Sequence, residues 1–383
     1  MQSTLAGQLT RFTHLLQKEL FPILEGEVGG LGETAKRVVQ VLAMVPLRRF
    51  VRVSSGWNGR PAQDRYAIAC AFVAKAVYQF STTRHLIERL QSDAQLRSIC
   101  GWKRREDLPH ESTFSRAFAE FAAMELPQFV HEALIVETQK GRLIGHISRD
   151  STAIEAREHF PEVIQRDKKK TLPKASRKGA KNQMKRKKKR LRPATRLQRQ
   201  GEMKLAAMLA ELPRKCSIGT KTSSKGHQHY WRGYKLHLDV ADGQGPISAV
   251  LTGASLHDSQ LAIPLATMTA QRVTSLYDLM DAAYDASEIH AHSRSLGHVP
   301  IINPAHRGRK TNNVIAPGKP KRQFSEAEEQ RFQERTTVER VNARIKDDFG
   351  GRTIRVRGPV KVMAHLMFGI LALTVEQLMR LTQ

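Results

Sequence analysis

The sequence predicts an α/β protein, in which an all-helical N-terminal domain (residues 1–140) precedes a mixed sheet with packed helices (residues 141–383). Two observations carry this prediction. Apolar residues recur at helical spacing up to about residue 140, whereas short apolar runs alternate with helical patterns beyond it. Strands that first form a meander and then alternate with helices are typical of a mixed sheet covered by helices.

The N-terminal part contains several helical segments. "DRYAIACAFVAKAVYQF", residues 64–80, is apolar at helical spacing and follows Pro61, a helix-start signal. Residues 82–124 then hold two short helical stretches, a polar loop and a helix with Arg116 near its start. This order suits a helix-turn-helix DNA reader in which Arg116 contacts DNA, although an ordinary helical bundle gives the same pattern.

The strands of the C-terminal part are read from their apolar patterns. "RLIGHISRD", residues 142–150, predicts a first strand that ends at Asp150. "YKLHLDV" alternates strictly, and "PISAVLTGA" follows it across a short turn, so the two predict a hairpin. The later elements are a helix near 259–271, a strand at 274–281, a helix from 286, a strand at 299–304 and one helix within 331–351.

A basic insertion at about residues 152–226 separates the first strand from the hairpin. Residues 166–200 hold 17 Lys and Arg against one Asp, so this run carries +16 of the formal net charge of +27. Such a run is most often solvated, and its contacts with phosphates would be independent of sequence. Within it we take Lys187, Lys188 and Arg190 as candidate DNA contacts.

The composition favours a nucleic-acid partner. A pI near 10.4 and a net charge that stays at +11 outside the basic run indicate a polyanionic ligand. Three isolated cysteines give neither a zinc pattern nor a disulfide framework. The apolar run "HLMFGILALTV" is too short to span a bilayer and predicts a buried helix, and we expect neither a secretory signal nor a membrane partner.

Three carboxylates stand where a site could form. Asp150 closes the first strand, Asp281 closes the strand at 274–281, and Glu339 lies on the late helix. Neighbouring strand ends crossed by a helix would bring the three together, and their repulsion calls for a divalent cation. All-oxygen ligation favours Mg²⁺ or Mn²⁺, and two such ions suit phosphoryl chemistry.

Two other acids compete with Asp281. Asp278 lies inside the same strand, where it could be a structural acid with satisfied partners. Asp285 is better explained as the N-cap of the next helix, with Glu288 completing a capping box. We therefore place the chemistry at Asp281.

The late helix carries four spaced residues. Phe332, Arg335, Glu339 and Lys346 fall within roughly 60° of one another at about 100° per residue, beside an apolar stripe. An exposed helix with one i,i+4 ion pair has the same pattern. Only the rest of the chain favours the functional interpretation.

These residues resemble the DDE transposases of bacterial insertion sequences, in the group whose third motif reads Tyr-x2-Arg-x3-Glu-x6-Lys. Phenylalanine replaces the tyrosine here, at Phe332, and both inner spacings are intact. "DAAYD" resembles the second motif, with Ala283 where glycine is usual, and "TGASLHDS", residues 252–259, resembles an upstream family segment. The resemblance covers roughly residues 142–383.

The resemblance implies an RNase H-like catalytic domain that cuts DNA at the ends of an element and joins the 3′-hydroxyl to a target. Asp150, Asp281 and Glu339 would hold two metal ions, with Arg335 and Lys346 on the DNA. A working homodimer and a place in the bacterial cytoplasm at the nucleoid are further expectations. The alternatives are a metal-dependent nuclease of the same fold and a DNA-binding relic without catalysis.

Overall fold

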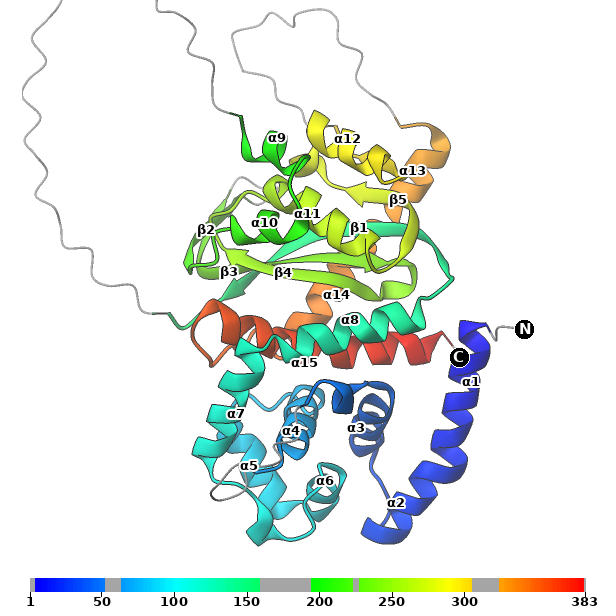
Figure 1. Cartoon of the computed structure of the whole chain (residues 1–383), viewed down its shortest axis with the longest axis vertical. Helices are drawn as coiled ribbons and strands as arrows, with labels where there is room; N and C mark the ends of the chain where they lie inside the picture. The colour runs from blue at the N-terminus through cyan, green and yellow to red at the C-terminus, as the bar shows by residue number, and fades with distance from the viewer. Residues whose placement is uncertain (1–3, 52–62, 159–193, 223–226, 305–323, 382–383) are drawn as a thin grey trace, which may run out of the picture.

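A helical part and a sheet part lie one above the other, with the last helix between them (Figure 1). The computed structural model describes residues 4–51, 63–158, 194–222, 227–304 and 324–381. The two ends of the described chain lie near each other beside α1. Lys187, Lys188 and Arg190, the DNA contacts predicted in the basic run, lie outside the described residues.

The helical part forms as the sequence predicts. Asp64 caps α4 by accepting a hydrogen bond from the Tyr66 backbone N–H at 2.8 Å, and the alanine-rich helix behind it is buried. Its helices are α1 (Leu5–Leu15), α2 (Phe21–Val28), α3 (Glu33–Met44), α4 (Arg65–Val77), α5 (Thr83–Ser92), α6 (Ala94–Ile99), α7 (Glu111–Ala123) and α8 (Leu126–Thr138). A π-helical stretch, η1 (Leu16–Leu20), joins α1 to α2, and η2 (Leu47–Arg49) and η3 (Arg105–Asp107) are 3₁₀ turns.

The sheet is mixed, as expected. Its order is β2-β3-β1-β5-β6, and β4 pairs with β3. β3 runs antiparallel to β1, β2 and β4, whereas β5 is parallel to both β1 and β6. The strands are β1 (Leu143–Glu155), β2 (Ser217–Thr222), β3 (Gln228–Ala241), β4 (Pro246–Gly253), β5 (Thr274–Met280) and β6 (Val299–Ile302).

Helices cover both faces of the sheet, so its strands are apolar on both sides. One face packs against α10, α11 and α12 through residues such as Met280 and Ile263. On the other face, Leu236 and Leu238 of β3 join the core formed with the last helices. The helices of the sheet part are α9 (Arg196–Gln200), α10 (Leu205–Ala210), α11 (Ser259–Ala270), α12 (Ser287–Ser295), α13 (Glu326–Gln333), α14 (Thr336–Asp347) and α15 (Pro359–Arg380), with turns η4 (Asp242–Gln244) and η5 (Ala282–Tyr284).

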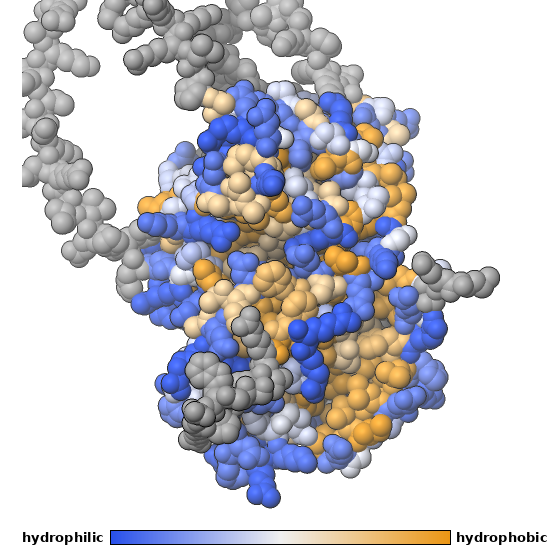
Figure 2. All heavy atoms as spheres, viewed as in Figure 1, coloured by the Kyte–Doolittle hydropathy of each residue, from blue (hydrophilic) through white to orange (hydrophobic). Residues whose placement is uncertain are grey.

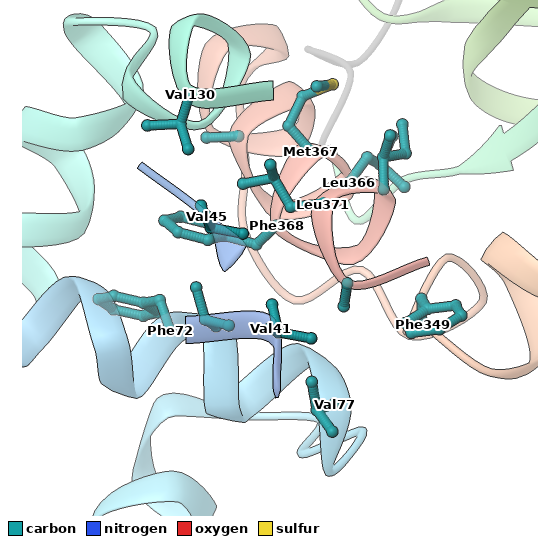
Figure 3. Packing of buried hydrophobic residues seen from close by; sticks show 14 of the residues in the cluster. Val41, Val45, Phe72, Val77, Val130, Phe349, Leu366, Met367, Phe368 and Leu371 are labelled. Atoms are coloured by element: carbon teal, nitrogen blue, oxygen red, sulfur yellow. The ribbon is translucent and has the colours of Figure 1, made fainter. Parts of the chain in front are cut away.

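The α15 helix joins the two parts into one core. Phe368 packs against Phe72 of α4, with ring centroids 5.8 Å apart, and Figure 3 shows Leu371 and Met367 of α15 among residues of the N-terminal helices. Its 22 residues correct the expectation that this apolar run is too short to span a bilayer. Among the described residues α15 is long and apolar enough to do so, but most of it is buried inside the fold, as for a core helix.

Several predicted boundaries were wrong. β1 continues five residues past Asp150, to Glu155, because its far end pairs with β3 as far as Gly233. Part of the expected insertion belongs to the fold, since α9, α10 and β2 pack on α11 and β3. The late helix is two helices, α13 and α14, with a break at residues 334–335.

The surface is mostly hydrophilic on the face shown in Figure 2, with apolar atoms gathered at mid-height and at lower right. A hollow lined by α8, β4, α10 and α15 opens in the middle region, and Phe129 and Val360 stand exposed beside it. This hollow contains none of the predicted site residues.

Candidate active site

Asp150 and Asp281 lie side by side on neighbouring strands. β1 and β5 are parallel, and their last paired residues are Arg149 and Met280, so the two aspartates follow directly from this pair. Paired strands run about 4.8 Å apart. β5 stops at Met280 while β1 continues, which leaves a notch along the open edge of β1.

The end of β5 is fixed by Asp281 itself. One of its carboxylate oxygens accepts a hydrogen bond from the Ala283 backbone N–H at 2.9 Å and so starts the turn η5. The other oxygen is not held by this bond. The alanine that replaces the usual glycine of the motif thus supplies a backbone N–H donor, as any residue except proline would.

The pocket at this notch holds as many acids as bases. Its volume is about 500 Å³. A site with both charges suits a substrate that is itself anionic and is accompanied by a cation. The charged residues of its lining are Asp150, Glu155, Asp258, Asp281, Lys221, Lys235, Lys346 and Arg352.

The carboxyl groups of this pocket resist ionisation. Burial raises the pKa of Asp150 to about 6, and the negative charges of Asp281 and Asp258 add to the effect. Burial also raises the pKa of Asp281, which Asp258 pushes further up and Arg335 pulls down. A positive charge placed between these two carboxyl groups would lower the pKa of both.

Asp258 is a site residue that the sequence argument missed. It precedes α11, and one of its oxygens lies 2.9 Å from the Lys235 ammonium. Its charge acts on both Asp150 and Asp281. The signal was present in "TGASLHDS", which had been matched to the family without a role for its acid.

Glu339 stands beside the pocket and does not line it. Val338, Val341 and Ile345 bury one side of α14 against the sheet, as the apolar stripe predicted. The Glu339 side chain remains 51% exposed and pairs with Arg335, one turn earlier, at 2.7 Å. The structure therefore brings Asp150 and Asp281 together and holds the third predicted acid apart.

A different residue of α14, Asn342, contacts Asp150. The Asn342 amide nitrogen lies 3.4 Å from an Asp150 carboxylate oxygen, which makes a weak hydrogen bond. Asn342 follows Glu339 by three residues, so both side chains project from the same side of α14. The helix is thus oriented with this side toward the aspartates.

The two cations of the predicted motif both lie near the acids. Arg335 pairs with Glu339, and its positive charge also lowers the pKa of Asp281. Lys346 lines the pocket, where burial and the charges of Arg352 and Lys221 lower its pKa. Phe332 belongs to α13, and its ring contacts Phe324 at 5.2 Å and faces the Arg335 guanidinium at 5.7 Å.

The rivals of Asp281 have structural surroundings. Asp278 is buried and accepts hydrogen bonds from Ser293 at 2.5 Å and from His298 at 3.2 Å, as expected for a satisfied structural acid. The N-cap prediction for Asp285 was wrong, because Ala286 occupies the N-cap of α12. Asp285 instead contacts His290 at 3.1 Å.

A buried ion pair locks the strands behind the site. The Arg149 guanidinium makes two hydrogen bonds of 2.7 Å to Asp239 on β3, and it lies 4.0 Å from Asp278 on β5. Both partners of the short pair are fully buried. A guanidinium fork between two carboxylates fixes the register of β1 against its neighbours, and hence the position of Asp150.

Arg116 lies on α7 in the helical part and does not line the carboxylate pocket. Its guanidinium borders a separate hollow that also contains Lys103, Arg104 and His110. His110 caps α7 by accepting from the Ser112 backbone N–H at 3.2 Å. The DNA contact of Arg116 remains a prediction.

The donor chemistry of the pocket fits a divalent cation. Mg²⁺ is usually bound by one or two carboxylates, with water and substrate oxygens completing its shell. Asp150 and Asp281 supply such a pair. Within the described ranges, no three Asp, Glu, His or Cys side chains gather at ligating distance, so a complete protein cage is not built there.

Comparison with protein families agrees with the geometry. Residues 143–375 match the family model of the transposase DDE domain, and residues 31–120 match a second model, a transposase domain. The first match spans the sheet and α11 to α15, including Asp150, Asp281 and Glu339. Searches among curated proteins and among solved structures gave no match.

Proposed function

Because this chain belongs to the DDE transposase family, we propose that it binds the terminal repeats of a mobile element, cuts the DNA there and joins the freed 3′-hydroxyl to target DNA. The observation that carries the proposal is the pairing of Asp150 with Asp281 at the notch beside β1. Buried acids in a pocket rimmed by lysine and arginine suit a phosphodiester accompanied by a divalent cation.

The residues of the pocket have different roles in the proposed reaction. Asp150 and Asp281 would hold the cation, Mg²⁺ or Mn²⁺. The family resemblance implies a pair of such ions, whose chemistry would be to activate the attacking oxygen and stabilise the leaving one. Lys346 and Arg352 line the same pocket and would contact the phosphate. Asn342 orients the Asp150 carboxylate through its amide.

Glu339 completes the acid set once DNA is bound. A DNA phosphate competes with Glu339 for the Arg335 guanidinium, which binds phosphate in a bidentate way. An exposed pair of this kind is worth only about 0.3–0.5 kcal/mol, so the exchange costs little. The released carboxylate can then turn toward Asp281, which already feels the charge of Arg335.

The remaining contacts extend along the DNA. In our proposal the helical part, with Arg116, binds the element end, and Lys187, Lys188 and Arg190 add contacts that do not depend on sequence. The parallel pair β1 and β5 beside antiparallel β3 supports an RNase H-like fold. A homodimer would pair two element ends, and the reaction would occur at the bacterial nucleoid.

Two alternatives differ in the product. A nuclease of the same fold would cut without joining. A DNA-binding relic would bind DNA and do neither. Both are decided by one assay.

The test is a cleavage and joining assay on labelled DNA that carries the element's terminal repeats, with Mg²⁺ or EDTA. We expect the wild type to cut and join only with metal, and Glu339→Gln to bind DNA without cutting. Glu202→Gln, at an exposed acid between α9 and α10, is the matched control and should remain active. Equal binding without any cutting by wild type would overturn the proposal.

A further inference from the structure

The segment Thr252–Ser259, "TGASLHDS", has no role in the chemistry described so far. It links the end of β4 to the start of α11. Thr252 at its start contacts buried His237, with 2.9 Å between the hydroxyl and the ring Nε2. At its end the His257 ring contacts the Ser259 hydroxyl at 2.8 Å. Both ends of the segment are therefore held by side chains.

The backbone of the segment is held as well. The Gly253 N–H donates to the Pro213 carbonyl at 2.7 Å, and a Cβ at this position would lie 2.4 Å from the Lys215 carbonyl oxygen. Only glycine allows this close approach. The Leu256 carbonyl accepts a hydrogen bond from the Lys235 ammonium at 2.9 Å. These contacts leave Asp258 at one place, the wall of the carboxylate pocket.

Asp258 and Lys235 form a partly buried ion pair within that wall. Their charged atoms are 2.9 Å apart, and the two side chains are 23% and 13% exposed. The Ser151 side chain, next to Asp150 in the chain, also lies close enough to Asp258 to lower its pKa. The pair thus joins α11 and β3 to the strand that carries the first aspartate.

The field of Asp258 reaches both neighbouring aspartates. Its negative charge opposes the ionisation of Asp150 and of Asp281. A charge that makes two carboxylates harder to ionise makes the space between them more attractive to a cation. Lys235 acts in the opposite sense, because its ammonium offsets part of the charge of Asp258.

We propose that the Asp258–Lys235 pair sets the charge of the pocket: Asp258 is a positioning residue that raises divalent-cation affinity at Asp150 and Asp281, and Lys235 limits that affinity. This inference rests on the proposed function, since it assumes that a cation binds there. In this proposal the segment "TGASLHDS" holds one negative charge at a fixed place beside the metal ligands.

A purely structural ion pair predicts a different pattern. If the pair only tied α11 to β3, loss of either partner would loosen the same contact, and both substitutions would change metal affinity in the same direction. If the pair sets the pocket charge, the two substitutions act in opposite directions. The sign of the change separates these possibilities.

The experiment is an isothermal titration calorimetry measurement in which the full chain, without DNA, is titrated with Mn²⁺. We compare the wild type with Asp258→Asn, Lys235→Met and the double variant. Asp242→Asn is the control, because Asp242 pairs with Arg142 at 2.7 Å near the other end of β1. Thermal unfolding checks that each variant is folded.

We expect Asp258→Asn to weaken Mn²⁺ binding about tenfold and Lys235→Met to strengthen it about as much. The double variant should bind Mn²⁺ with nearly wild-type affinity. A unit charge in the wall of the pocket changes the affinity for a divalent ion by roughly this factor. Asp258→Glu should restore most of the affinity, and the control should change nothing. Changes of the same sign in both single variants, or no change in either, overturn the inference.

The two proposals fail in distinguishable ways. If the wild type binds Mn²⁺ but the variants do not move in opposite directions, only the role of the Asp258–Lys235 pair is wrong. If the wild type neither binds Mn²⁺ nor cuts DNA, the proposed function fails, and this inference fails with it.

Discussion

Replacing Asp150 by asparagine is expected to stabilise the protein at neutral pH when no divalent metal is present. Burial and two neighbouring acids raise the pKa of Asp150 from 3.8 to about 6. At 1.36 kcal/mol for each pKa unit, this gap corresponds to about 3 kcal/mol of unfavourable free energy for the ionised carboxyl in the folded state. Asparagine has nearly the same shape and no charge.

The sign follows from proton linkage. The folded protein binds the Asp150 proton more tightly than the unfolded chain does, so this group's contribution to stability is full below pH 3.8 and is lost as the pH rises to about 6. The advantage of asparagine is therefore largest above pH 6. At pH 5 the stability difference between the asparagine variant and the wild type should fall to about half of its value above pH 6.

The assay is urea unfolding in EDTA at pH 7.5 and pH 5, with the midpoint and slope compared between variants. Asparagine does not accept all the bonds of a carboxylate, so we expect a gain of about 1–3 kcal/mol at pH 7.5. Excess Mg²⁺ should reverse the order, because the cation binds the carboxylate and stabilises the wild type. If the asparagine variant is no more stable than wild type in EDTA at pH 7.5, the ionised Asp150 carboxyl does not destabilise the folded state.

Three further predictions concern the surroundings of the aspartates. Arg335→Gln should free Glu339 from its ion pair, so that Mn²⁺ binds more tightly in the absence of DNA while the affinity for DNA falls. If a titration shows unchanged Mn²⁺ affinity, Arg335 does not hold Glu339 away from the metal site. Arg149→Met should leave the buried Asp239 carboxylate without its cation, with only the Thr269 hydroxyl still donating to it, and cost about 3–5 kcal/mol of unfolding free energy, measured by urea unfolding. A loss below about 1 kcal/mol would show that the pair does not hold the strands. Phe72→Ala should cost about 3–5 kcal/mol because it opens a cavity against α15, and cooperative unfolding at an unchanged midpoint would contradict the shared core.

Much of the fold was readable because its patterns are local. The hairpin of β3 and β4 is fixed by alternation around a short turn, and α4 by its cap and its apolar spacing. The ends of elements were harder to predict. β1 continues to Glu155 through pairing with β3, a partner almost 80 residues away in the sequence, and no local signal marks such an extension.

The break between α13 and α14 shows a different limit. Residues 331–351 carry one continuous helical pattern, and neither Pro nor Gly interrupts it near residue 335. The break occurs where the Glu334 carbonyl accepts a hydrogen bond from the Ser148 hydroxyl at 3.2 Å. A contact between distant segments at this point cannot be inferred from spacing.

The candidate site was predicted in part. Asp150 and Asp281 meet because two strand ends are neighbours, which the order of elements already indicated. The place of Glu339 depends on which of two partners its side chain takes, and the sequence offers both. Asp258 was missed because it precedes α11 while its partner Lys235 lies on β3, and an ion pair between distant segments leaves no mark in the spacing of either.

Iron-mediated cleavage of the protein chain would locate the bound cation. In this experiment Fe²⁺ replaces Mg²⁺ and generates radicals that cut the backbone near the ion. We expect cuts near residues 150 and 281 in the protein alone, and an additional cut near residue 339 once DNA with the terminal repeats is bound. Excess Mg²⁺ should suppress all three. Cuts at other places, or none near residues 150 and 281, would contradict a metal site formed by these carboxylates.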